Sequence, residues 1–154
     1  MPTNTSAIFS AYGSVTASEK AYASVKTLAD AIALVKKTTK AVDEAKASAL
    51  EMAANAEACA AKAMREVQMY MLSTGSSEDQ DYDVDQVVGA SAVTIDATAD
   101  ALNAMRLYAK ACDAVIDAKM CLNAAQVNAQ VTASAAAKLT RCTNQIVKQA
   151  IDLA

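Results

Sequence analysis

The sequence predicts an all-α fold, a long antiparallel helical hairpin with alanine-rich, coiled-coil-like seams. Three observations lead to this fold class. Alanine, the strongest helix former, occupies 38 of 154 positions, whereas the chain has three glycines and one proline. Apolar or small residues recur at alternating intervals of three and four residues in both halves of the chain. One acidic stretch separates the two halves.

The first predicted arm runs from about residue 6 to residue 72. Its spaced stripe predicts one helix of about 60 residues and about 90 Å, although a break within residues 36–39 is an alternative. The predicted stripe consists of Tyr22, Val25, Leu28, Ile32, Val35, Thr39, Val42, Ala45, Ala49, Met52, Ala56, Cys59, Ala63, Val67 and Tyr70.

The loop is predicted at residues 73–86, where Gly75 and several hydroxyl residues precede a run of carboxylates without a cation. Such a run is incompatible with a helix interior. The two arms are therefore expected to form one helical domain that spans residues 1–154, joined at this loop.

The second predicted arm runs from about residue 87 to residue 153 and carries a sustained heptad. Its seam consists of Ala97, Ala101, Ala104, Tyr108, Ala111, Val115, Ala118, Leu122, Ala125, Ala129, Thr132, Ala136, Leu139, Thr143, Ile146, Ala150 and Leu153. Small residues let helix axes approach more closely than the usual 8–10 Å or so, which favours repetitive packing into a polymer. The amides Gln126, Asn128 and Gln130 lie off this seam, where they either bond to another helix or face water.

Composition argues against several classes of protein. A net charge of −3 and a pI of about 4.9 disfavour nucleic-acid binding and binding to an anionic membrane surface. The chain has no histidine, no phosphate-binding glycine loop and no CxxC motif, so we expect no catalytic residues, no metal and no cofactor. Neither a secretory signal nor a spanning segment is visible, which predicts a cytoplasmic protein. Cys59, Cys112, Cys121 and Cys142 are then reduced thiols, with disulfides or a metal site as alternatives.

Because histidine is absent, carboxylates are the groups that would sense acid. They are crowded in the loop and in two like-charged pairs spaced four residues apart. The candidate pH-sensing residues are Glu78, Asp79, Asp81, Asp83, Asp85, Asp96, Asp100, Asp113 and Asp117. The alternative is an ordinary solvated loop and solvated helix faces.

Residues 105–137 resemble the RebB-like "killing trait" family, the structural proteins of refractile bodies. The resemblance rests on Leu107-Tyr108, the spaced alanines, the amides Gln126, Asn128 and Gln130, and the ending at residues 131–136. An upstream stretch at residues 92–94 also fits the start of the family pattern. The match covers about 45 residues and departs from the pattern at Val127, which interrupts the glutamine run.

This resemblance implies a bacterial, cytoplasmic protein that forms coiled ribbons with itself and with homologous subunits. Such ribbons extend, in some types on acidification, and rupture a membrane to deliver toxin. We therefore expect an assembly seam of Ala104, Leu107, Tyr108, Ala111, Val115, Ala118, Leu122, Ala125, Ala129, Thr132 and Ala136. Two other interpretations stay open, namely a different helical filament or coat subunit, as in a capsid or a granule coat, and a soluble helical-bundle adaptor.

Overall fold

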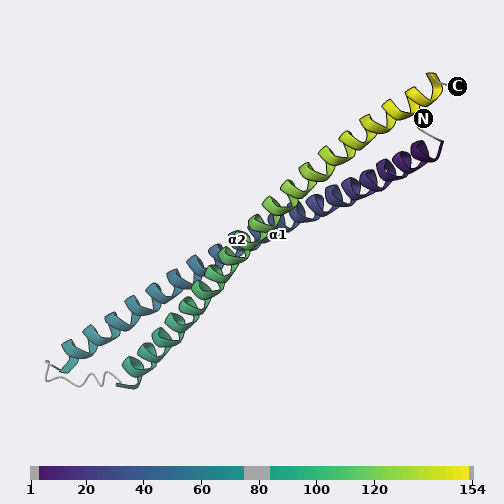
Figure 1. Cartoon of the computed structure of the whole chain (residues 1–154). Helices are drawn as coiled ribbons and strands as arrows, with labels where there is room; N and C mark the ends of the chain where they lie inside the picture. Colours follow the sequence, from purple (N-terminus) through teal and green to yellow (C-terminus); the bar gives the residue numbers. More distant parts are fainter. Residues whose placement is uncertain (1–3, 75–83, 153–154) are drawn as a thin grey trace. The chain divides into compact units, whose positions relative to one another are not determined.

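The computed structural model describes residues 4–74 and 84–152. Over these residues the chain forms two α-helices, α1 (Asn4–Thr74) and α2 (Val84–Asp152), as Figure 1 shows. The predicted all-α fold is confirmed. Helix α1 continues through residues 36–39, so each arm is a single helix. Residues 75–83, which hold most of the predicted loop, lie outside the described residues. Residues 73–74 and 84–86, at the two ends of the predicted loop, are helical instead.

Each helix contributes to two compact units. Unit 1 comprises residues 1–37 and 115–154, and unit 2 comprises residues 38–114. Within each unit, a segment of α1 packs against a segment of α2 that runs in the opposite direction (Figure 1). In unit 1, Ser10 pairs with Thr143 and Ser24 pairs with Thr132, which fixes this antiparallel register. The predicted antiparallel helical hairpin is therefore confirmed.

The buried and half-buried positions of unit 1 follow a heptad on both helices. On α1 they include Ala7, Ser10, Ser14, Ala17, Ala21, Ser24, Leu28, Ala31 and Val35. On α2 they include Val115, Ala118, Leu122, Ala125, Ala129, Thr132, Ala136, Thr143 and Ile146. We call these positions the seam of unit 1.

Unit 2 repeats the same spacing with larger side chains. The seam of unit 2 includes, on α1, Thr38, Val42, Ala45, Ala49, Met52, Ala56, Cys59, Ala63, Glu66, Tyr70 and Ser73. On α2 it includes Val87, Ala90, Thr94, Ala97, Ala101, Ala104, Tyr108 and Ala111. The heptad predicted for the second arm matches the buried positions at every described residue except Leu139, which is 41% exposed.

The stripe predicted for the first arm is wrong at five positions, three of them at its start. Tyr22, Val25 and Ile32 are 77%, 53% and 41% exposed, and the buried or half-buried positions are their neighbours Ala21, Ser24 and Ala31. Thr39 and Val67 are also exposed, beside the half-buried Thr38 and Glu66. At the start of the stripe the larger side chain of each pair faces water, so size does not select the interior position. Serine is accepted there because its hydroxyl donates to a carbonyl four residues earlier in the same helix, which satisfies the buried group.

The interior of the two units consists of very small side chains. Among the described residues, the buried hydrophobic side chains are all alanine, and Ser24 is the buried polar one. The chain exposes 11360 Å² of accessible surface. A folded monomer of this mass, 15.9 kDa, typically exposes about 7,300 Å². The helix pair thus leaves much of its surface, including most of its large apolar side chains, in contact with water.

Candidate assembly surface

Most of the predicted assembly seam is occupied within the chain itself. Its alanines at 104, 118, 125, 129 and 136 are buried, and Tyr108, Ala111, Val115, Leu122 and Thr132 are half-buried, each within its own unit. Leu107 is 54% exposed and lies off the seam. Because these positions already pack against α1, an assembly needs a further surface.

Hydroxyl groups connect the two helices in unit 1. The Thr132 hydroxyl donates to Ser24 Oγ at 2.9 Å, and Ser24 Oγ donates to the Lys20 carbonyl at 2.8 Å. Ser24 is only 5% exposed, so this pair excludes water from the contact. The Thr132 proton also has the carbonyls of Asn128 and Ala129 within reach, at 2.9 and 3.2 Å.

Two further hydroxyl pairs lie toward the chain termini in the same unit. Ser10 Oγ and Thr143 Oγ1 are 2.9 Å apart, and the Thr143 hydroxyl also lies 3.1 Å from the Ser10 carbonyl. Ser14 Oγ and Thr140 Oγ1 are 3.1 Å apart. Bonds of this length require close helix approach, which the neighbouring alanines permit.

Grooves along the helix pair define two faces. One groove of unit 1 is lined by Lys20, Ala23, Ser24, Thr27, Asn128 and Thr132, and one groove of unit 2 is lined by Lys62, Glu66, Gln86, Gly89, Ala90 and Val93. We call the side of each unit that carries its groove the groove face of that unit. On the opposite side of α1 in unit 1, a shallow hollow is lined by Ser14, Val15, Ser18, Glu19 and Tyr22. We call that side the outer face.

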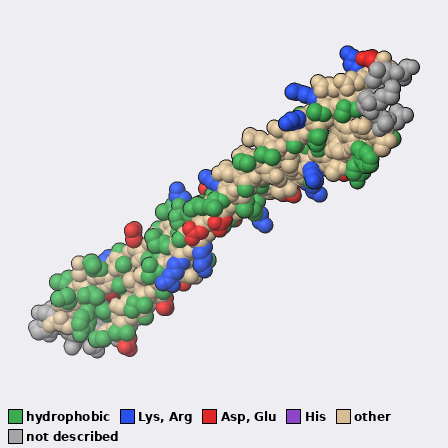
Figure 2. Space-filling model, viewed as in Figure 1, with side chains coloured by type: hydrophobic (Ala, Val, Ile, Leu, Met, Phe, Trp, Pro, Cys, Tyr) green, Lys and Arg blue, Asp and Glu red, His purple; other side chains and the backbone are tan. Residues whose placement is uncertain are grey.

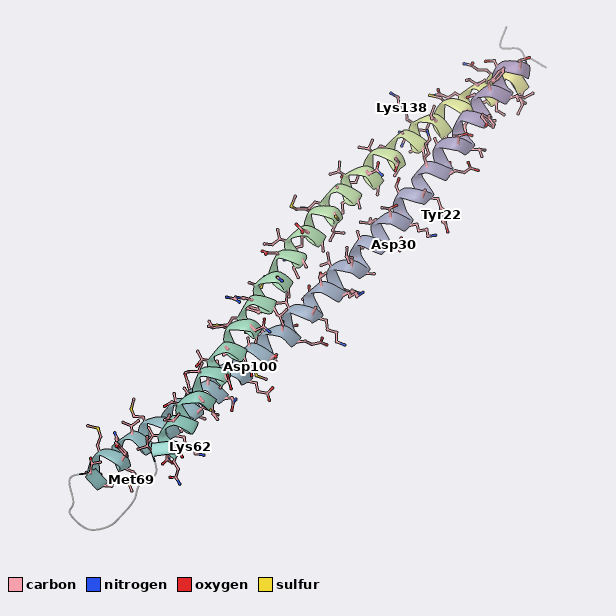
Figure 3. The ribbon with its side chains drawn as sticks, turned by 90° about the horizontal axis from the view of Figure 1, so that it is seen from below. Tyr22, Asp30, Lys62, Met69, Asp100 and Lys138 are labelled. Atoms are coloured by element: carbon pink, nitrogen blue, oxygen red, sulfur yellow. The ribbon has the colours of Figure 1, made fainter. Side chains whose placement is uncertain are left out.

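The outer face of unit 1 carries a second heptad stripe on α1. Figure 3 shows Tyr22 pointing away from α2. The stripe has the same alternating spacing as the seam but is exposed throughout, and it contains no charged residue. The outer stripe of unit 1 consists of Ile8, Ala11, Val15, Ser18, Tyr22, Val25, Ala29 and Ile32. The corresponding positions of α2 in this unit are mostly amides or small residues, among them Asn123, Gln126, Gln130, Ala133, Ala137, Thr140 and Asn144.

In unit 2 the apolar outer stripe lies on the other helix. The outer stripe of unit 2 consists of Val84, Val88, Ser91, Ile95, Thr98, Leu102, Met105, Ala109 and Cys112. The corresponding positions of α1 are interrupted by Asp43, Lys46 and Glu57. Figure 2 shows hydrophobic side chains on the surface of both units, interspersed with charged ones.

The predicted pH-sensing carboxylates lie at the surface where they are described. Asp96, Asp100, Asp113 and Asp117 are exposed on α2, and Asp85 is exposed in its first turn. Asp96, Asp100 and Asp113 belong to unit 2, whereas Asp117 belongs to unit 1. Glu78, Asp79, Asp81 and Asp83 lie outside the described residues.

Tyr108 is the titratable group with a perturbed environment in unit 2. A hydrogen bond with the Cys112 thiol and the charge of its thiolate raise the pKa of the Tyr108 hydroxyl above its ordinary value of 10.0, with smaller contributions from burial and from Asp43. Each of these disfavours the phenolate.

The four cysteines are free thiols. Within residues 4–74 and 84–152, no group of three or more His, Cys, Asp or Glu side chains is placed to hold a metal ion. Neither helix, over its described length, is long and apolar enough to cross a membrane.

Comparison with known proteins finds no protein-family model, no curated protein and no solved structure that matches this chain.

Proposed function

We propose that the chain is a structural subunit of a self-assembling helical polymer. One observation carries this proposal: the helix pair buries alanines and leaves large apolar side chains exposed in both units. Burying an alanine methyl group stabilises a fold far less than burying a valine or an isoleucine, at roughly 25 cal/mol per Å². A neighbouring copy that covers the outer face supplies the missing burial.

Within this class, we propose a ribbon of the refractile-body type that coils and extends, ruptures a membrane and delivers toxin, made in bacterial cytoplasm. The resemblance at residues 105–137 and the absence of histidine support it, since carboxylates are then left as the acid-sensitive groups. Two packings that differ by a few kcal/mol per subunit suffice for such a switch.

Negative-stain electron microscopy of the purified protein near neutral pH and in acid tests both statements. Ribbons or scrolls that lengthen in acid support the proposal. Filaments indifferent to acid support a coat or capsid subunit instead. Small particles at both pH values contradict homopolymer formation and favour an adaptor, unless co-expression with a homologous subunit restores ribbons.

The acid response is tested by combining Asp113→Asn with Asp117→Asn. Two ionised carboxylates one helical turn apart repel each other, which disfavours the packed state by a few tenths of a kcal/mol. The double variant is neutral there at every pH, so its transition is expected at higher pH than in the parent. Asp96→Asn with Asp100→Asn is the matched pair in unit 2, and an unchanged midpoint in either double variant removes that pair as a sensor.

A further inference from the structure

The outer stripe of unit 1 reads almost the same from both ends. Its order is Ile, Ala, Val, Ser, Tyr, Val, Ala, Ile, from Ile8 to Ile32. If two copies lie antiparallel across this stripe, every residue meets its counterpart: Ile8 meets Ile32, Ala11 meets Ala29, Val15 meets Val25 and Ser18 meets Tyr22. These are the layers that two antiparallel heptad helices form.

From this self-complementarity we infer that the outer face of unit 1 binds a second copy of this chain through a two-fold, antiparallel contact. The inference rests on the proposed polymer and names one of its interfaces. An isologous contact requires that a patch be complementary to itself, which an ordinary apolar stripe is not.

The mismatched central layer fits the shape of the surface. Ser18 lies in the shallow hollow between Val15 and Tyr22, and the antiparallel arrangement directs Tyr22 of the second copy toward that hollow. The Ser18 hydroxyl donates to the Ser14 carbonyl at 2.9 Å, so covering it leaves no unsatisfied donor. The large Tyr22 side chain of one copy thus meets the small Ser18 side chain of the other, whose hydroxyl is already hydrogen-bonded. This contact occurs twice in the dimer.

Helix α2 gives an independent check, because its register against α1 is fixed within unit 1. Ser14 pairs with Thr140 and Ser24 pairs with Thr132, so the middle of the outer stripe lies beside residues 134–136 of α2. The rotation that exchanges Val15 with Val25 therefore exchanges Ala133 with Ala137.

The same rotation brings the amides of α2 together. Gln126 of one copy faces Asn144 of the other, and Gln130 faces Thr140. Polar groups capable of mutual hydrogen bonds thus flank the two facing alanines, while the apolar residues of α1 face one another. The same two-fold axis therefore gives compatible residue pairs on both helices, although the sequence of the α1 stripe does not determine the sequence of α2.

The area is sufficient for a specific contact. The stripe spans about 36 Å along the helix, and two adjacent helices present a face about 20 Å wide. The two copies together then bury about 1,400 Å², which is within the usual range of about 1,200–2,000 Å² for stable interfaces. The outer stripe of unit 2 lacks this symmetric order, so the inference concerns unit 1 alone.

Disulfide trapping tests the arrangement in the full chain, with Cys59, Cys112, Cys121 and Cys142 replaced by serine. We expect Val15→Cys mixed with Val25→Cys to give cross-linked dimers that contain one copy of each variant. Each variant alone is expected to stay uncross-linked, because two copies of the same position lie about 15 Å apart along the axis, too far for a disulfide whose Cα atoms need about 4.4–6.8 Å. Gln126→Cys mixed with Asn144→Cys is expected to give the same result on α2, where two copies of the same position lie about 27 Å apart along the axis.

The other outcomes overturn the inference. Cross-linking of each variant with itself means parallel pairing, and no cross-link in any mixture means that the stripe covers something other than a second copy. Filaments without the mixed cross-link refute this interface but not the polymer, whereas mixed dimers without filaments refute the polymer but not the interface.

A charge substitution gives the energetic test. Val15→Lys with Val25→Lys is expected to raise the dimer dissociation constant at least about 100-fold, since each change occurs twice in a two-fold contact and a tenfold loss is about 1.4 kcal/mol. Val131→Lys is the matched control: its valine is 61% exposed, against 56% for Val15, but lies off the outer stripe positions. Circular dichroism confirms that each variant is helical, and equal losses in the variant and the control would overturn the assignment.

Discussion

Unit 1 and unit 2 use the same heptad spacing but fill it with different side chains. Unit 1 joins its helices through small residues and through hydroxyl pairs such as Ser24 with Thr132, at 2.9 Å. The seam of unit 2 admits larger groups, including Met52, Tyr70 and Tyr108. The comparison indicates that unit 1 depends on close approach of the two backbones, whereas unit 2 depends on apolar contact area.

The apolar outer stripe also changes helices between the units. It lies on α1 in unit 1 and on α2 in unit 2. The paired helix carries amides beside alanines at the same positions in unit 1, and the charged Asp43, Lys46 and Glu57 among apolar residues in unit 2. Each unit therefore offers a neighbour one uncharged apolar stripe and one mixed stripe. Such a face favours one orientation of the neighbour over its reverse, because reversal would place charges such as Asp43 and Lys46 against an apolar stripe.

The largest expected effect is at Ala118, which is 2% exposed in the seam of unit 1. Ala118→Leu forces extra volume between two closely spaced helices and is expected to lower the free energy of unfolding by about 1–3 kcal/mol. Urea unfolding followed by circular dichroism, at a concentration where the chain is monomeric, measures this loss.

Two comparisons sharpen that experiment. Ala124→Leu, at an exposed position of the same helix, is expected to change stability by less than about 0.5 kcal/mol. Ala63→Leu, at a half-buried seam position of unit 2, is expected to cost less than Ala118→Leu. Equal costs at Ala118 and Ala63 would show that the two units are packed equally closely and would break the comparison.

The next effect tests the hydroxyl pairs. Ser24→Ala removes the group that accepts from Thr132, and is expected to destabilise unit 1 by about 0.5–1.5 kcal/mol. The loss is limited because Thr132 retains carbonyl acceptors in its own helix. Ser18→Ala is the matched control, since Ser18 makes the same bond within its helix but is exposed and bonds to no residue of α2 that the structure describes. A similar loss in both variants would mean that the bond between helices adds nothing.

Some parts of this fold are predictable from the sequence, and others are not. The fold class, two single arms and the seam of α2 follow from alanine content and spacing, because one helical period dominates there. The start of the α1 seam was misassigned because two heptad stripes lie one residue apart, and Tyr22 is larger than Ala21. The presence of two stripes on α1 could have indicated this, because a helix that packs against two neighbours needs one stripe for each of them. Which stripe faces α2 depends on the hydroxyl pairs, and these join residues more than a hundred positions apart.

A smaller effect is expected from the exposed ion pair in unit 2. Lys40 Nζ and Glu44 Oε1 are 3.6 Å apart, one helical turn from each other, with side chains 80% and 68% exposed. Glu44→Gln is expected to cost no more than about 0.5 kcal/mol and to lose its effect in high salt. Glu51→Gln is the control, because no cation lies three or four residues from Glu51. A salt-independent loss at Glu44 would indicate a role other than this ion pair.

The smallest effect on stability is expected at Tyr108, where a titration reports on the seam of unit 2. Cys112→Ala removes the hydrogen bond and the thiolate charge, so the pKa of the Tyr108 hydroxyl is expected to fall toward its ordinary value. Asp43→Asn is expected to lower this pKa less.

The raised pKa of Tyr108 means that the neutral phenol is favoured in the folded chain. Its contribution to the free energy of unfolding is therefore present below pH 10 and is lost as the pH rises through the pKa of the folded chain. Ultraviolet absorbance of the phenolate measures the titration, with Tyr108→Phe subtracted to remove the other tyrosines. An unchanged midpoint in Cys112→Ala would contradict the hydrogen bond between Tyr108 and Cys112, and an unchanged midpoint in Asp43→Asn would mean that the charge of Asp43 does not act on Tyr108.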